Sequence, residues 1–151
     1  MKTIKLLFIL CVCGLMTACG DTASAPNSKT TDKTASESTT ISEKLSVEEF
    51  HAKMNKISNE QVVDVRSIEE LVETGKIAGA KHIDYHGEKF NSQIDELDKD
   101  RPIMVYCKSG GRSGKTAKML QQMRFKEVYD MKGGMKSWKA KNMPTDPVSY
   151  D

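Results

Sequence analysis

Short apolar runs alternate with helix-forming segments from residue 46 onward, and this alternation limits the possible folds more than any other feature of the sequence. Two helix-forming segments begin with the spacing of a capping box, Ser46 with Glu49 and Ser67 with Glu70. Continuous apolar runs between such segments are typical of a mostly parallel sheet that helices cover on both faces. The apolar runs are residues 61–65, 81–84, 102–106 and 127–131. The sequence therefore predicts a three-layer α/β domain, with its ligand site beyond the carboxyl ends of the strands.

The first eighteen residues have the layout of an export signal. Lys2 and Lys5 stand near the start of an apolar run that ends at Met16, and small residues follow before Cys19. The apolar run is short for a segment that spans a bilayer. We expect residues 1–18 to be a signal peptide that is removed from the mature protein.

The segment LMTAC at the end of this signal resembles a bacterial lipobox, in which the cysteine becomes the lipidated first residue of the mature chain. Met16 stands where a lipobox usually has Leu. Lipidation of Cys19 would anchor the protein in a membrane, since several acyl chains give lasting attachment. An ordinary signal peptide cut near Ala18 and an uncleaved anchor are the alternatives, and all three export the domain. We expect an exported, membrane-anchored lipoprotein, at an outer membrane facing the periplasm or at the surface of a single-membrane bacterium.

Residues 19–44 consist mainly of Ser, Thr, Ala, Asp and Lys, with hardly any apolar side chain. Such a segment cannot bury enough surface to offset its ordering entropy, so we expect it to be a flexible tether. The folded domain should then comprise residues 45–151.

Removal of the signal changes both the charge and the thiol content of the chain. Without the two lysines of the signal, the 23 basic residues fall to 21, which equals the number of acidic residues. A near-neutral mature chain gives no support for nucleic-acid binding. Loss of Cys11 and Cys13, with lipidation of Cys19, leaves Cys107 as the single free thiol. No intramolecular disulfide is then expected.

A glycine-rich loop begins at this remaining thiol. Cys107 follows the third apolar run, and a helix is predicted from Ser113 to Arg124. The loop would point consecutive backbone N–H groups into one concavity at a helix N-terminus, which is an anion site, and Gly110 and Gly111 would permit the unusual backbone angles. A thiol held there among cationic side chains has a depressed pKa and is a nucleophile suited to an anionic substrate. The candidate site consists of Cys107 as the reacting group, with Lys108, Ser109, Gly110, Gly111, Arg112 and Ser113 as substrate-binding residues.

Two other interpretations of the loop are weaker. A nucleotide-binding P-loop would fit Gly114-Lys115-Thr116, but Ser109 occupies the place of its first glycine. A cysteine that merely fills the core would have apolar neighbours, whereas glycines and basic residues flank Cys107.

Three motifs follow one another along the chain: DVR at residues 64–66 with Glu70 and GAKHI at 79–83, the loop CKSGGRS at 107–113, and Gly133-Gly134 with Trp138. These motifs, in this order, resemble the rhodanese, or thiosulfate sulfurtransferase, family, over nearly all of the chain from Ser46 to about Pro144. One departure is that the turn before Gly79 is a residue longer than usual, with Lys76 where the family often has His.

The resemblance implies a rhodanese-like three-layer domain with a five-stranded, mostly parallel sheet and a double-displacement reaction at Cys107. The thiolate would take the outer sulfur of a donor such as thiosulfate, and a thiol or cyanide acceptor would then remove it from the resulting persulfide. The resemblance implies no metal and no organic cofactor. The expected partners are these small molecules and, through Cys19, a membrane. We expect the protein to be a monomer.

Alternative functions stay open beside sulfur transfer. Related cysteine phosphatases and arsenate reductases have five residues between the cysteine and the arginine, whereas four separate Cys107 from Arg112 here, which favours sulfur over phosphorus. A persulfide carrier or a redox-sensing domain without steady turnover would use the same loop.

Asp64 and Arg66 are expected to form a structural pair near the site, and Arg66 is a further candidate for substrate contact. His82 is expected to be structural. His51 and His86 do not have the spacing that is typical of metal ligands.

Overall fold

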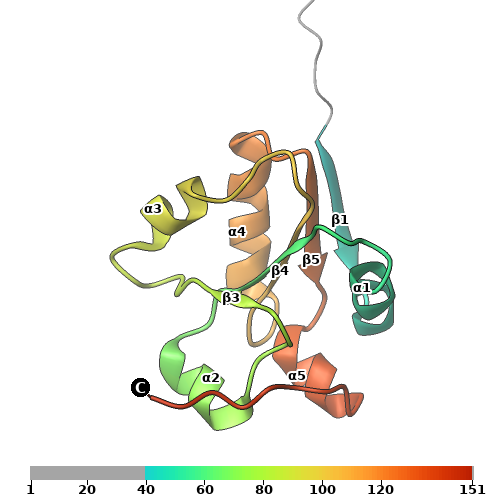
Figure 1. Cartoon of the computed structure of the whole chain (residues 1–151), viewed down its shortest axis with the longest axis vertical. Coiled ribbons are helices and arrows are strands. Elements are labelled where there is room, and N and C mark those ends of the chain that lie inside the picture. Colours follow the sequence, from blue (N-terminus) through green and yellow to red (C-terminus); the bar gives the residue numbers. More distant parts are fainter. Residues whose placement is uncertain (1–39, 151) are drawn as a thin grey trace, which may run out of the picture. The chain divides into compact units, whose positions relative to one another are not determined.

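Five parallel strands form one sheet in the part of the chain that the structure describes, residues 40–150 (Figure 1). The structure is a computed structural model. The strands are β1 Ile41–Leu45, β2 Gln61–Asp64, β3 Lys81–His82, β4 Ile103–Tyr106 and β5 Glu127–Met131. Their order in the sheet is β1-β5-β4-β2-β3, and each neighbouring pair is parallel. The prediction of a five-stranded parallel sheet is confirmed.

Helices cover both faces of this sheet. They are α1 Val47–Met54, α2 Ile68–Thr74, α3 Phe90–Asp95, α4 Gly111–Gln122 and α5 Gly134–Ala140. Neighbouring residues of a strand point to opposite faces. In β4, Val105 packs in the cluster that contains residues of α3 and α4, while Met104 packs in the cluster that contains residues of α1 and α5. Every residue of β4 is buried, which explains why this strand is a continuous apolar run. Because helices pack on both faces of the sheet, the predicted three-layer arrangement is confirmed.

Both capping boxes begin helices at the predicted places. Ser46 Oγ accepts a hydrogen bond from the Glu49 N–H at 3.2 Å, and the Glu49 carboxylate accepts one from the Ser46 N–H at 2.8 Å. The Glu70 carboxylate likewise accepts from the Ser67 N–H at 3.1 Å at the start of α2. That helix ends at Gly75, whose φ is 70°. The predicted stop at this glycine is therefore confirmed.

β1 differs from the expectation, since residues 41–44 lie within the segment predicted to be a tether. Its first four residues are exposed, and only Leu45 is buried. As an edge strand, β1 pairs through its backbone with β5, from Ile41 opposite Glu127 to Leu45 opposite Met131. Exposed side chains on such a strand need no apolar pattern, so the composition does not reveal it. The domain includes residue 41, and the boundary predicted at residue 45 is too late.

Residues 1–39 lie outside the described part of the chain. They carry the predicted signal peptide, Cys19 and most of the predicted tether. Between residues 40 and 150, the structure contains no helix that has both the length and the apolar character needed to cross a bilayer.

Candidate active site

Cys107 is the first residue after β4, at the carboxyl end of a central strand of the sheet, as predicted. Its side chain is buried, with 1% of the residue exposed. The loop after it is shorter than expected, because α4 begins at Gly111 rather than at Ser113. Gly110 has a φ of 95°, whereas Gly111 is not among the residues with positive φ. Of the two glycines expected to have unusual backbone angles, only Gly110 has one.

Hydrogen-bond donors surround the Cys107 thiol at the start of α4. The Gly110 N–H donates to Cys107 Sγ at 3.1 Å. Ser109, through its backbone, and Ser113, through its backbone and side chain, are further hydrogen-bond partners of the thiol. Burial raises the pKa of the Cys107 thiol, but these hydrogen bonds outweigh it, so that the pKa lies below its usual range. The loop therefore favours a thiolate.

The N-terminus of α5 fixes the backbone of the cysteine loop. The N–H groups of Met135 and Lys136 donate to the carbonyls of Cys107 and Lys108 at 2.8 and 2.9 Å. Gly134 lies so close to the Cys107 carbonyl that a β-carbon would overlap with it, and its φ of 54° also favours glycine. The glycine pair of the third sequence motif therefore positions the reactive loop.

Arg112 forms a two-pronged ion pair with Glu70 of α2. Its Nη1 and Nη2 lie 2.7 and 2.8 Å from the two carboxylate oxygens, and Lys108 Nζ is 4.0 Å from the same carboxylate. The hydrogen bond from Arg112 is the main cause that lowers the pKa of Glu70. The hydrogen bond to Glu70 is the main cause that raises the pKa of Arg112, and the nearby Cys107 raises it further. Glu70 thus belongs to the site, although its spacing from Ser67 suggested only a helix cap.

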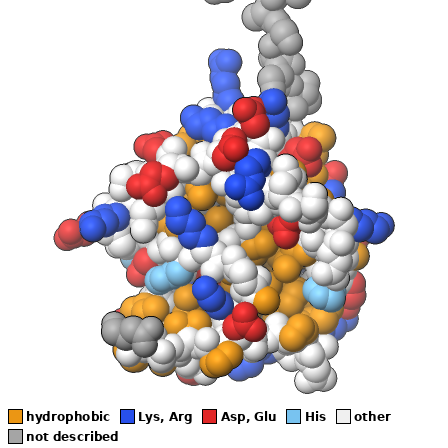
Figure 2. Space-filling view, viewed as in Figure 1, with side chains coloured by type: hydrophobic (Ala, Val, Ile, Leu, Met, Phe, Trp, Pro, Cys, Tyr) orange, Lys and Arg blue, Asp and Glu red, His pale blue; other side chains and the backbone are white. Residues whose placement is uncertain are grey.

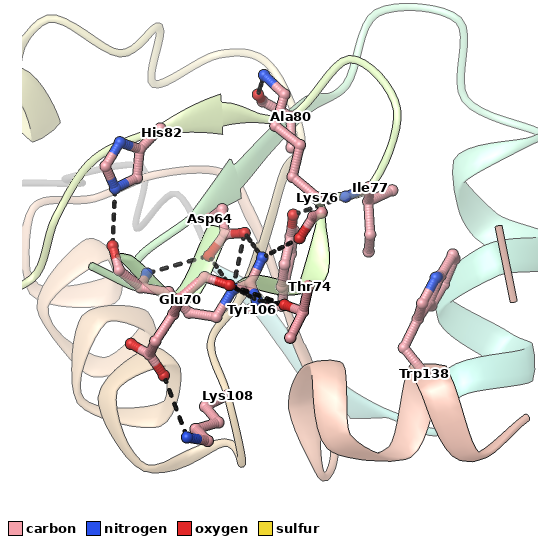
Figure 3. A network of polar contacts seen from close by, with 12 residues as sticks. Asp64, Glu70, Thr74, Lys76, Ile77, Ala80, His82, Tyr106, Lys108 and Trp138 are labelled. Carbon is pink, nitrogen blue, oxygen red and sulfur yellow. Dashed lines mark hydrogen bonds and ion pairs between the residues drawn. The ribbon is translucent and has the colours of Figure 1, made fainter. Parts of the chain in front are cut away.

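Arg66 is buried and forms an ion pair with Asp64, as the sequence predicts. Figure 3 shows Asp64 within the network of polar contacts around this pair. Arg66 Nη2 lies 2.6 Å from Asp64 Oδ2, and Nη2 also donates to the Gly75 carbonyl at 2.7 Å. Its Nη1 donates to Thr74 Oγ1 at 2.7 Å and to the Glu70 carbonyl at 3.3 Å. Its Nε donates to Asp64 Oδ1 at 2.9 Å, so all three guanidinium nitrogens have acceptors within the protein. Direct contact between Arg66 and a substrate stays a prediction, and this arrangement disfavours it.

The histidine predicted to be structural has a backbone partner. His82 Nε2 donates to the Arg66 carbonyl at 2.7 Å (Figure 3). In residues 40–150, no group of three or more His, Cys, Asp and Glu side chains is arranged to hold a metal ion.

A hollow of about 160 Å³ adjoins the loop at Lys108. The buried side chain of Met135 contributes an apolar wall, and α5 contributes two lysines that the sequence did not single out for the site. Over the face shown in Figure 2, basic and acidic side chains are interspersed and do not form a patch of one sign. The hollow is lined by Arg66, Glu70, Glu73, Thr74, Lys108, Met135, Lys136 and Lys139.

Asp130 of β5 contacts the site through Ser113. The Ser113 hydroxyl donates to Asp130 Oδ1 at 2.6 Å, and both residues are buried. Burial raises the pKa of Asp130, although Ser113 and Lys44 partly oppose it. Sequence reasoning missed Asp130, and its only signal is a charged residue between the apolar residues Tyr129 and Met131 of β5.

Comparisons with known proteins identify the family of this domain. A family model described as the Rhodanese-like domain matches residues 46–141. The chain is 36% identical over 101 residues to YqhL of Bacillus subtilis, which covers 67% of this chain and 75% of that protein. It is 35% identical over 85 residues to the thiosulfate sulfurtransferase GlpE of Coxiella burnetii, which covers 56% of this chain and 77% of that protein. The polysulfide-sulfur transferase homodimer of Wolinella succinogenes has a similar structure, with a TM-score of 0.61 at 26% identity over 74% of this chain and 81% of that one. The family match covers most of the described domain, and the chain therefore belongs to the rhodanese-like domain family.

Proposed function

We propose that this protein is a thiosulfate sulfurtransferase that carries a sulfane sulfur as a persulfide on Cys107. The observation that supports it most is the hydrogen bonding around Cys107 Sγ, which lowers the pKa of the thiol at a helix N-terminus. Similarity to a thiosulfate sulfurtransferase and to a polysulfide-sulfur transferase supports the same chemistry.

The reaction would proceed in two displacements. The Cys107 thiolate attacks the outer sulfur of thiosulfate, the sulfur–sulfur bond of the donor breaks, and sulfite leaves with the electron pair. An acceptor thiolate or cyanide then attacks the outer sulfur of the persulfide, and the bonding electrons return to Cys107 Sγ. The N–H groups of Ser109, Gly110 and Ser113 that face the sulfur would stabilise both the thiolate and the persulfide anion.

The charged side chains around the loop would attract the donor. Lys108 is exposed and lies at the edge of the hollow beside the loop. Arg112 has a planar guanidinium whose N–H groups suit the oxygens of an oxyanion. Because these N–H groups bind the Glu70 carboxylate, an oxyanion donor would have to share them with Glu70. The substrates we propose are a small anionic sulfur donor and a thiol or cyanide acceptor. The proposed sulfur transfer between them requires no metal or organic cofactor.

We further propose that the protein works as an exported lipoprotein. The lipobox-like segment that ends at Cys19 supports this, as does a following stretch that could hold the domain away from a membrane. The domain would then meet its sulfur donor outside the cytoplasm, either in a periplasm or at the cell surface.

The test is the mass of the purified domain before and after treatment with thiosulfate. We expect the addition of one sulfur atom at Cys107, its removal by cyanide, and steady turnover when both substrates are present. Loading without turnover would instead identify a persulfide carrier. Hydrolysis of an aryl phosphate without loading would identify a phosphatase and contradict the proposal.

A further inference from the structure

We propose that Asp130 is a positioning residue for Cys107, and that the two side chains share one negative charge through the hydroxyl of Ser113. The inference rests on the proposed role of Cys107 as the reacting thiolate. It assigns to Asp130 a function beyond that of holding β5 against α4.

The single proton of the Ser113 hydroxyl is the basis of this link. Ser113 is fully buried, its Oγ lies 2.6 Å from Asp130 Oδ1, and its side chain is also a hydrogen-bond partner of the Cys107 thiol. A hydroxyl donates one hydrogen bond but accepts others. While Asp130 is ionised, it takes the hydrogen bond from Ser113, and the sulfur keeps its other partners, among them the Gly110 N–H and the Arg112 side chain. Once Asp130 is protonated, it donates to Ser113 Oγ and leaves the hydroxyl hydrogen for the sulfur.

The proton movement that connects the two states is balanced. The S–H bond of Cys107 breaks, and its proton passes to Ser113 Oγ as the proton of Ser113 passes to Asp130 Oδ1. The negative charge moves from the carboxylate to the sulfur, and no atom is oxidised or reduced. The final state has a Cys107 thiolate that accepts from Ser113, which in turn accepts from a neutral Asp130. Two groups coupled in this way titrate as a pair rather than independently.

The surroundings of Asp130 allow either charge state. Lys44 of β1 pairs with it in the strand register, and Lys44 Nζ lies 3.4 Å from Asp130 Oδ2, which favours the carboxylate. Burial favours the neutral acid, since only 5% of the residue is exposed. Asp130 also borders a hollow of about 410 Å³ with Glu43 of β1 and with Lys115 and Lys118 of α4. Through this hollow Asp130 can exchange its proton with solvent, away from the hollow beside Lys108.

The test measures how fast iodoacetamide, a neutral reagent, alkylates Cys107 at different pH values in the full-length protein. Peptide mass spectrometry reports Cys107 separately from the other cysteines. Asp130→Asn should lower the midpoint of the pH profile by about one unit, since coupled sites interact by roughly that amount or more. In a Ser113→Ala background, the same substitution should lose most of this effect. Equal shifts in both backgrounds would mean direct charge repulsion, and no shift in either would mean a purely structural role. Both results overturn the proposal.

A surface substitution provides a second test that leaves the buried residues intact. Lys44 is half exposed, and Lys44→Ala should favour the neutral form of Asp130 and so lower the alkylation midpoint of Cys107. Simple loss of a nearby positive charge would raise that midpoint, so the two explanations predict opposite signs. Lys126→Ala, which removes an exposed lysine that pairs with Asp100, is the matched control and should cause no shift. A raised or unchanged midpoint in Lys44→Ala contradicts the proposal. Because alkylation requires only the thiolate, failure of sulfur loading with this coupling intact would contradict the proposed function alone.

Discussion

Glu70 binds both terminal nitrogens of the Arg112 guanidinium, at 2.7 and 2.8 Å, although the two residues are 42 positions apart in the sequence. The ion pair joins α2 to the first turn of α4, next to Cys107. It neutralises part of the positive charge that Arg112 would bring to an anionic donor. A bound oxyanion must therefore share the guanidinium with Glu70, and the strength of this pair sets how much of Arg112 is available to substrate.

Substitutions of this pair should have opposite effects on the donor half-reaction. Arg112→Ala should lower kcat/KM for thiosulfate by about ten- to a hundredfold, because a hydrogen bond to a charged group contributes roughly 1.5–3 kcal/mol. Glu70→Gln should lower KM for thiosulfate, since Gln keeps the capping box but releases the guanidinium. Steady-state kinetics with varied thiosulfate measure both effects. Arg101→Ala is the control, because Arg101 precedes β4 and donates to the carbonyls of Asn59 and Glu60. Wild-type kinetics in Arg112→Ala would contradict the assignment.

Local sequence patterns were sufficient for the elements that are buried or capped. β4 is buried on both faces and is a continuous apolar run at the predicted place. β5 is buried from Val128 to Met131 and also lies at its predicted place, although Glu127 and Asp130 interrupt its apolar residues. The two capping boxes mark α1 and α2 because their hydrogen bonds join residues three positions apart. The cysteine loop was predictable for the same reason, since the thiol, the glycines and the helix start are adjacent in the chain.

Features that depend on distant residues had no such local signal. β1 is defined by its backbone pairing with β5, and β3 ends at His82 rather than at the predicted residue 84. The ion pair of Glu70 with Arg112 and the hydrogen bond of Ser113 with Asp130 each join segments that only the folded sheet brings together. Without an observed fold, nothing in the spacing of these residues connects them.

Gly134→Ala should destabilise the domain and displace the cysteine loop. The new β-carbon would overlap with the Cys107 carbonyl, and the residue would have to keep a positive φ. The expected loss in the free energy of unfolding is roughly 2–4 kcal/mol, from backbone strain and overpacking. Gly111→Ala is the matched control, because no atom lies within 4 Å of its β-carbon position. Its stability should change by about 0.5 kcal/mol or less. Denaturant unfolding of the two variants checks the prediction, and equal stabilities would contradict it.

Sulfur loading should saturate at a pH below the ordinary range of thiols. Hydrogen bonds from Ser113, Ser109 and Gly110 outweigh burial and lower the pKa of Cys107 in the folded state. The rate of loading by thiosulfate should rise with pH and reach half of its maximum below about 8.5, the pKa of a free cysteine. A lowered folded-state pKa also stabilises the fold fully above the unfolded-state pKa, and this stabilisation is lost as the pH falls through the folded-state value. The difference in unfolding free energy between wild type and Cys107→Ser should therefore shrink toward low pH. A loading midpoint at or above that of a free thiol would contradict this prediction.

Cys19→Ala should release the protein from membranes or stall its processing. Processing at the lipobox-like segment would make this cysteine the first residue of the mature chain, where attached acyl chains would hold the protein at a bilayer. Fractionation of cells that produce the full chain, with mass analysis of the mature N-terminus, measures both outcomes. Cys11→Ala serves as the control, since that cysteine lies within the predicted signal peptide. Equal membrane association of the Cys19→Ala variant, with an unmodified N-terminus in the wild type, would rule out the lipid anchor.

Cys107→Ser should abolish sulfur loading and turnover while the domain stays folded. Serine is nearly isosteric with cysteine, but its hydroxyl stays protonated at a pH at which the Cys107 thiol ionises, so it cannot attack the donor. If Cys19 is lipidated, the mature chain has no second thiol to take sulfur from Cys107, and the persulfide must pass directly to an external acceptor. We therefore expect ping-pong kinetics and a loaded wild-type enzyme that survives removal of excess thiosulfate. Mass spectrometry of a soluble form that begins after Cys19 should find one added sulfur atom in the wild type and none in Cys107→Ser. Far-ultraviolet circular dichroism and thermal unfolding should find the same fold in both. Sulfur transfer by a folded Cys107→Ser variant would exclude Cys107 as the carrier, and loading of the wild type at any other residue would do the same.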